Sequence, residues 1–369
     1  MISRRNVLKT GLLAVQAAVC AAGSGLSGNV LAAAATAWRM PDESEPHAAT
    51  WMGFGASNAI WGSKLKAGAR DSIALIARTI AQFEPVNLLV KDAEYDIASS
   101  KCGASVNLVV QDLDDLWLRD TGPVFVKSNS GMLAGIDFNF NGWGEKQTYG
   151  KDTYVADAIT QQVGAKRLQT QLTLEGGGIE VDGRGNAIIT ESCVLNANRN
   201  PGMSKATVEA ELKRLLGLQK IIWLKGIRGK DITDGHTDFY ARFVSPGVVV
   251  AGYDPDPASY DHAVTLNNIA TLRNATDANG RKLQVIVLPA PSTVRPKYES
   301  AEFAAGYINF YVCNDAVIAP QFGDAKADAN ARSILREQFP NREIVQLNID
   351  AIAAGGGGIH CTTQQQPAP

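Results

Sequence analysis

The chain has 369 residues, of which 45% are apolar and 20% are charged. That length and apolar content can build one large hydrophobic core or two ordinary ones, which excludes an intrinsically disordered chain. The formal net charge is −2 and the lysines and arginines are scattered, so the composition also excludes a basic surface of the kind that binds nucleic acid.

Residues 1–35 have the pattern of a secretory signal: a charged start, a short apolar stretch and an alanine-rich end with A-x-A cleavage sites. The pair Arg4-Arg5 resembles the twin-arginine (Tat) signal, by which bacteria export folded proteins. A membrane anchor is the weaker alternative because glycines interrupt the short apolar stretch, and a lipid anchor at Cys20 is weaker still. We therefore expect a soluble, periplasmic or secreted protein that meets the Tat export machinery in transit and has no stable membrane insertion after its signal is removed.

The cysteines that remain after removal of the signal are Cys102, Cys193, Cys313 and Cys361. An even number in an exported protein permits two disulfides. A large domain does not need such cross-links as a small one does, and folding before export lets a free thiol settle in a protected site. We expect at least Cys361 to be reduced, and the pairing of the other three stays open.

A recurring unit organises the rest of the chain, which the sequence predicts as one domain over residues 36–369. Hairpins, each with two β-rich runs around turn residues, are predicted at 122–140, 177–190, 235–253 and 307–321. Apolar residues three and four apart predict helices at 71–84, 205–217, 266–280 and 331–340. A third strand follows at 85–91, 220–225, 282–289 and 343–349. With an opening strand at ATWMGFG there are about five such strand, strand, helix, strand (ββαβ) units, which suggests an α/β ring around a central axis.

Reactive side chains stand beside glycine where equivalent strands begin, and a ring would bring these positions together at its centre. The segments LWLRDTGP, LEGGG, DGHTD and GGGGIHC supply Trp117, Asp120, Glu175, His236, Asp238 and Cys361. The four glycines before Cys361 permit close approach of the backbone to a ligand. The alternative for this stretch is a flexible tail.

This set of side chains suits attack on a guanidinium group. Carboxylates bind that flat cation bidentately along its edges, so Asp120 and Asp238 could fix it while a thiolate at Cys361 approaches the central carbon. His236 could carry protons to the departing ammonia and from the incoming water. A sulfur nucleophile divides the substitution into two steps through a covalent intermediate.

Each of these residues also has a structural alternative. The acids and His236 could cap turns, Glu175 could be a turn residue and Trp117 could be core. His47 and His262 are interpreted as structural or surface residues. No metal site is expected because H-x-x-x-H and C-x-x-C spacings are absent from the sequence, and a serine hydrolase would need a G-x-S-x-G elbow.

Eight segments in order resemble the agmatine deiminase and bacterial-type peptidylarginine deiminase family: WRMPDESEPHAATWMGF, LWLRDTGPVFV, FNFNGWG, LEGGGIEVDGRG, NANRNPG, DGHTDF, YINFYVCNDAVIAPQFGD and GGGGIHCTTQQQP. The resemblance implies a five-bladed α/β propeller with pseudo-fivefold symmetry, of the guanidino-group-modifying superfamily, without metal or organic cofactor. It implies that Cys361 is the nucleophile and His236 the general acid and base. It further implies that Asp120 and Asp238 clamp the guanidinium, that Glu175 orients His236, and that Trp117 is a pocket wall against the apolar stem of the substrate.

The expected reaction is the hydrolysis of agmatine, a small guanidino compound, to N-carbamoylputrescine and ammonia. Deimination of arginine in peptides is the main alternative; amidino transfer to an amine and simple binding of guanidino compounds are weaker ones. One departure bears on this choice, because Lys230 and Ile232 in GIRGKDITDGH stand where the agmatine branch usually has acids. Either Lys230 lines the pocket and favours a carboxylate-bearing substrate, or it points into water and Asp231 or Asp234 receives the agmatine amine.

Overall fold

The strands of this chain form five separate sheets in the computed structural model, which describes residues 37–300 and 302–369. The α/β class predicted from the sequence is confirmed. The predicted export signal lies outside the described residues. Within them, no helix is both long and apolar enough to cross a membrane.

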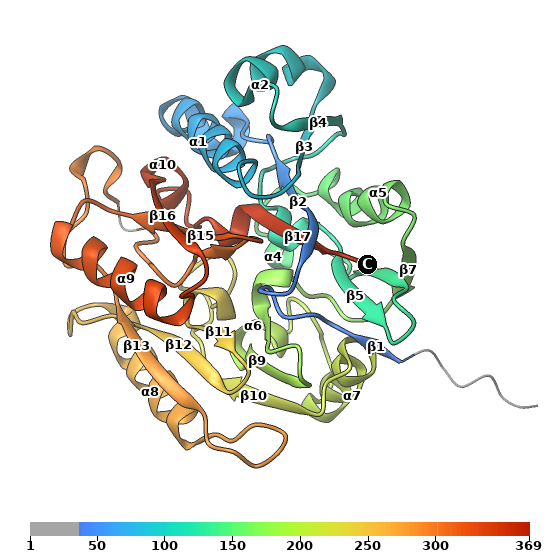
Figure 1. The fold of residues 1–369 in the computed structure, drawn as a ribbon, viewed down its shortest axis with the longest axis vertical. Helices are drawn as coiled ribbons and strands as arrows, with labels where there is room; N and C mark the ends of the chain where they lie inside the picture. The colour runs from blue at the N-terminus through green and yellow to red at the C-terminus, as the bar shows by residue number, and fades with distance from the viewer. Residues whose placement is uncertain (1–36, 301) are drawn as a thin grey trace, which may run out of the picture. The chain divides into compact units, whose positions relative to one another are not determined.

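Every sheet contains the predicted ββαβ unit (Figure 1). Two sheets have four strands: one has the order β17 (Thr363–Pro367), β2 (His47–Gly53), β3 (Val86–Val90), β4 (Asn107–Val110), and the other has the order β1 (Trp38–Arg39), β5 (Val124–Ser128), β6 (Leu133–Asp137), β7 (Lys166–Gln169). Three sheets have three strands: the first has the order β10 (Lys220–Leu224), β9 (Asn186–Thr190), β8 (Ile179–Val181), the second β11 (Ala241–Ser245), β12 (Val248–Tyr253), β13 (Gln284–Pro289), and the third β14 (Tyr311–Val312), β15 (Ala316–Gln321), β16 (Glu343–Asn348). The helices are α1 (Asn58–Ile80), α2 (Tyr95–Cys102), α3 (Leu118–Thr121), α4 (Gly142–Glu145), α5 (Val155–Gln162), α6 (Glu191–Val194), α7 (Lys205–Leu216), α8 (Tyr260–Asn274), α9 (Ala325–Gln338) and α10 (Asp350–Ala353).

The pairing within the sheets follows one rule. In each unit the first two strands are antiparallel, as in β5 with β6, and the second and third are parallel, as in β6 with β7. A helix connects the second strand to the third, which is the crossover that parallel neighbours require. The four predicted hairpins and the four predicted third strands are therefore confirmed.

Three predicted helices begin earlier in the structure than their apolar periodicity indicated, and the one predicted at 266–280 is α8, which begins at Tyr260 and ends at Asn274. The helix predicted at 71–84 begins at Asn58, where the Ser57 side chain accepts a hydrogen bond from the Ile60 amide. The helix predicted at 331–340 begins at Ala325 behind an equivalent cap by Asp324. In α1 and α9 the capping residue, rather than the apolar stripe, marks the start of the helix.

The last strand of the chain shares a sheet with the second strand. Strand β17 pairs antiparallel with β2, with Thr363 opposite Met52 (Figure 1). The segment GGGGIHC therefore leads into an ordered strand, and Thr363 and Gln364 are buried. The interpretation of this stretch as a flexible tail is wrong, because the residues that follow the glycines form strand β17, which is paired with β2.

Short turns carry the predicted reactive residues to the starts of the first strands. Helix α3 precedes β5, and the 3-10 turns η3 (Gly176–Gly178), η4 (Thr237–Phe239) and η6 (His360–Thr362) precede β8, β11 and β17. In the remaining sheet, Asn309 stands just before β14. The same place in all five sheets thus contributes polar side chains to one region.

Candidate active site

The predicted residues Cys361, His236, Glu175, Asp238 and Asp120 are all buried. A Cβ atom at Gly177 would lie 2.6 Å from His236 Nδ1, 2.9 Å from Asp120 Oδ1 and 3.1 Å from Asp238 Oδ2. Three of the predicted side chains therefore surround one small space that only a glycine backbone leaves open. The structure brings the predicted set together from four separate sheets.

The Cys361 thiol is held by two side chains. Asn309 donates from Nδ2 to Sγ at 3.2 Å, and its Oδ1 accepts from the Cys361 amide at 3.3 Å. Sγ also lies 3.4 Å from Asp238 Oδ2. Burial raises the pKa of Cys361 well above its ordinary value, and the carboxylates of Asp238 and Asp120 raise it further. At neutral pH the ligand-free site therefore holds a thiol rather than a thiolate.

Asp238 has one oxygen bonded and one oxygen free. Its Oδ2 accepts from His360 Nδ1 at 2.7 Å, whereas its Oδ1 is buried and finds no hydrogen-bond partner within residues 37–300 and 302–369. Burial favours the neutral acid, but His360 and His236 hold the pKa of Asp238 below its ordinary value. A buried acceptor without a donor is costly. The free oxygen is thus complementary to an N–H group on a cation.

Asp120 is oriented by two donors. Gly177 N donates to Oδ1 and Trp143 Nε1 donates to Oδ2, each at 3.0 Å. Burial raises the pKa of Asp120 to about 6; His236 opposes this rise and the neighbouring acids Glu175 and Asp238 add to it. A cation placed between Asp120 and Asp238 would favour the charged form of both carboxylates.

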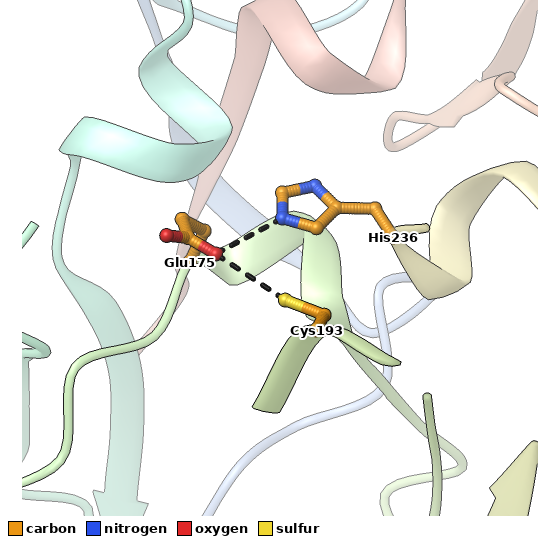
Figure 2. A group of neighbouring side chains, drawn as sticks. All are labelled: Glu175, Cys193 and His236. Atoms are coloured by element: carbon orange, nitrogen blue, oxygen red, sulfur yellow. Dashed lines mark hydrogen bonds and ion pairs between the residues drawn. The ribbon is translucent and has the colours of Figure 1, made fainter. Parts of the chain in front are cut away.

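His236 is paired with Glu175, as the resemblance implied (Figure 2). His236 Nε2 lies 3.1 Å from Glu175 Oε2, and the Cys193 thiol lies 3.5 Å from the same oxygen. Arg199 Nε donates to the other carboxylate oxygen at 2.6 Å. Burial lowers the pKa of His236, but Asp120, Cys193 and Glu175 outweigh it and hold that pKa well above its ordinary value. The ligand-free histidine is therefore an imidazolium, ready to give a proton.

Glu175, Cys193 and His236 also form a group whose donor atoms lie within 4.8 Å of one another, close enough to hold a metal ion. Burial and the Glu175 charge raise the pKa of Cys193 to about 11, so its thiol is protonated at neutral pH in the ligand-free protein. Arg199 already supplies a positive charge to Glu175. Hydrogen bonds and ion pairs therefore account for this arrangement.

Trp117 lies in the same apolar cluster as Cys361 and Trp143. Its ring stacks on Trp61 with a centroid separation of 5.7 Å, and a Cβ at Gly357 would come within 2.3 Å of it. The glycine run thus lets the backbone approach the indole closely. This placement fits the predicted pocket wall.

Replacing Gly177 with alanine is expected to lower kcat/KM by about a hundredfold, because displacement of catalytic groups by an ångström costs about that factor. The methyl group would push apart His236, Asp120 and Asp238. The matched control is Gly150→Ala, where a Cβ meets nothing within 4 Å. Steady-state kinetics on both variants check the prediction, and equal activities would contradict it.

Several residues at the site were missed from the sequence: Cys193, Arg199, Asn309, His360 and Trp143. The segments that hold Arg199, Asn309, His360 and Trp143 were recognised and Cys193 was considered only for disulfides, but no spacing rule connects these residues to the reactive set. His360 offered the clearest signal, because it directly precedes Cys361. The open question of disulfides is answered as well, since the four cysteines within the described residues are all free and buried.

The loop GIRGKDITDGH, which departs from the acid-rich pattern expected of the agmatine branch, points its lysine outward. Lys230 is exposed, and its ammonium lies over the Tyr260 ring at 5.6 Å. Ile232, by contrast, packs against the apolar cluster that holds Trp117 and Cys361. Asp234 is already bonded to Lys146, Asn198 and Arg199 and is not free to receive an amine. Of the two interpretations of Lys230, the one that points it into water agrees with the structure.

The two histidines interpreted as structural or surface residues lie outside the reactive set. His47 is buried beside Glu84, at 3.1 Å, and contacts Tyr311. His262 is partly buried and bonds the Asp254 carbonyl at 2.8 Å. Both contacts are local or structural.

The fold and the site together define a deiminase-type α/β protein. The structure is similar to a solved agmatine deiminase of Enterococcus faecalis, with a TM-score of 0.84, 32% identity, and coverage of 90% of this chain and 96% of that one. The agmatine deiminase of Pseudomonas aeruginosa is 37% identical to this chain, over 91% of this chain and 97% of its own length. The agmatine deiminase of Medicago truncatula is 36% identical to this chain, over 90% of this chain and 96% of its own length. Residues 39–367 match the Porphyromonas-type peptidyl-arginine deiminase family, and the chain belongs to that family.

Proposed function

We propose that this protein is an agmatine deiminase, a hydrolase of the C–N bond in a linear amidine. The observation that carries the proposal is the Asp238 carboxylate: its Oδ1 is buried without a partner within residues 37–300 and 302–369, and its Oδ2 lies 3.4 Å from Cys361 Sγ in the space that Asp120 also faces. Two carboxylates that face one small space suit a guanidinium. The names of the relatives point to agmatine as its source.

In the first proposed step, the bound guanidinium lets the Cys361 thiol lose its proton to solvent. The thiolate Sγ then bonds to the guanidinium carbon while Asp120 and Asp238 hold the terminal nitrogens. The bond from that carbon to one terminal nitrogen breaks, and His236 gives the departing nitrogen a proton, so that ammonia leaves. The carbon is then joined to sulfur, to the remaining NH₂ group and to the nitrogen that carries the aminobutyl chain.

In the second proposed step, water attacks the same carbon and gives a proton to His236. The C–S bond breaks, the second proton of the water passes to the Cys361 sulfur, and the product is the urea N-carbamoylputrescine. Glu175 pairs with the imidazolium form of His236 and is itself held by Arg199. Because Glu175 keeps that ring charged, it supports the first step more directly than the second.

The thiol of the ligand-free protein is expected to titrate only above its ordinary pKa. The bound guanidinium adds a positive charge beside Cys361 and lowers the pKa that burial and the two acids have raised. Subtracting the thiolate ultraviolet absorbance of Cys361→Ser from that of the unaltered protein isolates this group. We expect the signal to develop above pH 9 without ligand, and titration at or below pH 8 would contradict the account.

Peptidyl-arginine deimination is the second candidate, because the matched family carries that description. The outward position of Lys230 removes one cation that would have attracted a substrate carboxylate. Turnover of agmatine, free arginine and a peptide with carboxyl-terminal arginine should be compared side by side. Agmatine should give the highest kcat/KM, and a preference for the peptide would reverse the assignment. Ammonia release that depends on an added amine acceptor would indicate amidino transfer instead.

We also infer that the five sheets are the blades of a propeller. The common ββαβ pairing and the contribution of each strand start to one site support this arrangement.

For localisation we propose export to the periplasm through the twin-arginine route, on the basis of Arg4-Arg5 and the alanine-rich end of the predicted signal. Replacing both arginines with lysine should leave the protein in the cytoplasm. The activity of the purified mature form should be unchanged. Fractionation of cells with and without the substitution checks this, and efficient export of the lysine variant would remove the assignment.

A further inference from the structure

A histidine that the proposed steps do not use holds one of the two clamps. His360 directly precedes Cys361 in η6 and is 2% exposed. Its Nδ1 lies 2.7 Å from Asp238 Oδ2, and its Nε2 lies 3.0 Å from Glu43 Oε2. The imidazole therefore bridges two buried carboxylates, one in the site and one in the amino-terminal segment before β2.

Glu43 does not depend on His360 for its partners. Arg119 donates to Glu43 Oε2 at 3.0 Å, and Arg242 donates to Oε1 at 2.8 Å. The Val312 amide also donates to Oε1, at 2.8 Å. Within the part of the chain that the structure describes, Asp238 Oδ2 has only His360 and the Cys361 thiol. Loss of the imidazole would thus leave Glu43 paired but would remove the strong donor from Asp238.

The backbone of His360 is fixed on both sides. Its amide donates to the Asn309 carbonyl at 3.2 Å, and Arg119 Nε donates to its carbonyl at 3.3 Å. Asn309 also bonds the Cys361 thiol. The His360 backbone and the Cys361 thiol therefore share Asn309 as a support.

We propose that His360 is a positioning residue for deimination: its Nδ1–H holds Asp238 Oδ2 so that Oδ1 faces the guanidinium. Glu43, fixed by Arg119 and Arg242, holds the far side of the ring. This inference rests on the proposed function. It requires a proton on Nδ1, because a bare Nδ1 at 2.7 Å from the carboxylate would place two lone pairs against each other.

Two substitutions separate the two sides of the ring. Asparagine places its amide nitrogen near the position of Nδ1, so His360→Asn keeps a donor to Asp238. Glutamine places its amide nitrogen near the position of Nε2, so His360→Gln keeps the link to Glu43 only. We expect His360→Gln to lower kcat about tenfold to a hundredfold, the loss that one hydrogen bond to a charged group corresponds to, and His360→Asn to stay within about threefold of the unaltered enzyme.

The pH profile gives a readout that a merely structural role would not move. The titratable or charged groups that face Asp238 are His236, His360, Cys361, Asp120 and Arg242. Asp238 must be ionised to hold the substrate, and His360 helps to keep its pKa low. In His360→Gln the acid limb of kcat/KM should therefore move to higher pH, whereas in His360→Asn it should stay in place.

Equal losses in both variants with an unmoved acid limb would overturn the proposal, as would a larger loss in His360→Asn. Thermal unfolding of each variant shows whether it is folded. If neither folds, ¹⁵N spectra of histidine-labelled unaltered protein decide: a proton on Nδ1 of His360 supports the proposal, and a neutral ring protonated only on Nε2 overturns it. Failure of the unaltered protein to release ammonia from agmatine would reject the proposed function, while the spectrum would still locate the proton.

Discussion

Cys361→Ala is expected to lower ammonia release from agmatine by at least about 10⁴-fold, because the covalent route requires the sulfur and residual activity rests on binding alone. Sγ lies in the site, 3.2 Å from Asn309 Nδ2 and 3.4 Å from Asp238 Oδ2. Steady-state assays of ammonia and of the ureido product give the size of the loss.

A matched control is Cys102→Ala, which removes another buried, free thiol at the end of α2. It should leave kcat/KM nearly unchanged, because the hydrogen bonds that join Cys361, Asp238, Glu175 and His236 do not pass through Cys102. If Cys361→Ala retained most of its activity, Cys361 would not be the nucleophile.

Asp238→Asn is expected to remove about 3 kcal/mol or more of transition-state stabilisation, roughly a hundredfold or more in kcat/KM. The amide nitrogen can take either oxygen position, and both are unfavourable. At Oδ1 it would present a donor to the N–H groups of the guanidinium, and at Oδ2 it would face the donor at His360 Nδ1.

The control for Asp238→Asn is Asp328→Asn in α9. Asp328 is also a buried acid, and it accepts from Tyr307 Oη at 2.7 Å and from the Phe322 amide at 2.9 Å. Its substitution should lower the temperature of unfolding and leave kcat/KM of the folded enzyme within about threefold. A fewfold effect of Asp238→Asn on kcat/KM would mean that this carboxylate is structural.

The fold was predictable from the sequence because its unit is repeated. Pairs of β-rich runs around turn residues identified the hairpins within 122–140 and 235–253. The helical period at 205–217 identified α7 together with its end at Gly217, which is in the left-handed conformation with φ 70°. The pairing of β17 with β2 could not be predicted from local pattern, because it joins residues at opposite ends of the chain.

The candidate site could be predicted where a reactive side chain stands beside glycine at the start of a strand, as at Glu175 and His236. Asn309 and Arg199 gave no such signal. Each acts only through a contact with another segment: Asn309 with Cys361, and Arg199 with Glu175. The orientation of Lys230 was equally hidden, because a charge in a loop does not reveal which way its side chain points.

The most direct test of the central claim is the intact mass of the protein after rapid acid quenching during turnover of agmatine. We expect the unaltered protein to carry, on Cys361, an added mass equal to that of agmatine less ammonia, and we expect no such addition in Cys361→Ala. Peptide mapping should place it in the segment that ends the chain, GGGGIHCTTQQQPAP. The covalent mechanism would be contradicted if the unaltered protein kept an unmodified mass at every quench time during full turnover and Cys361→Ala remained active.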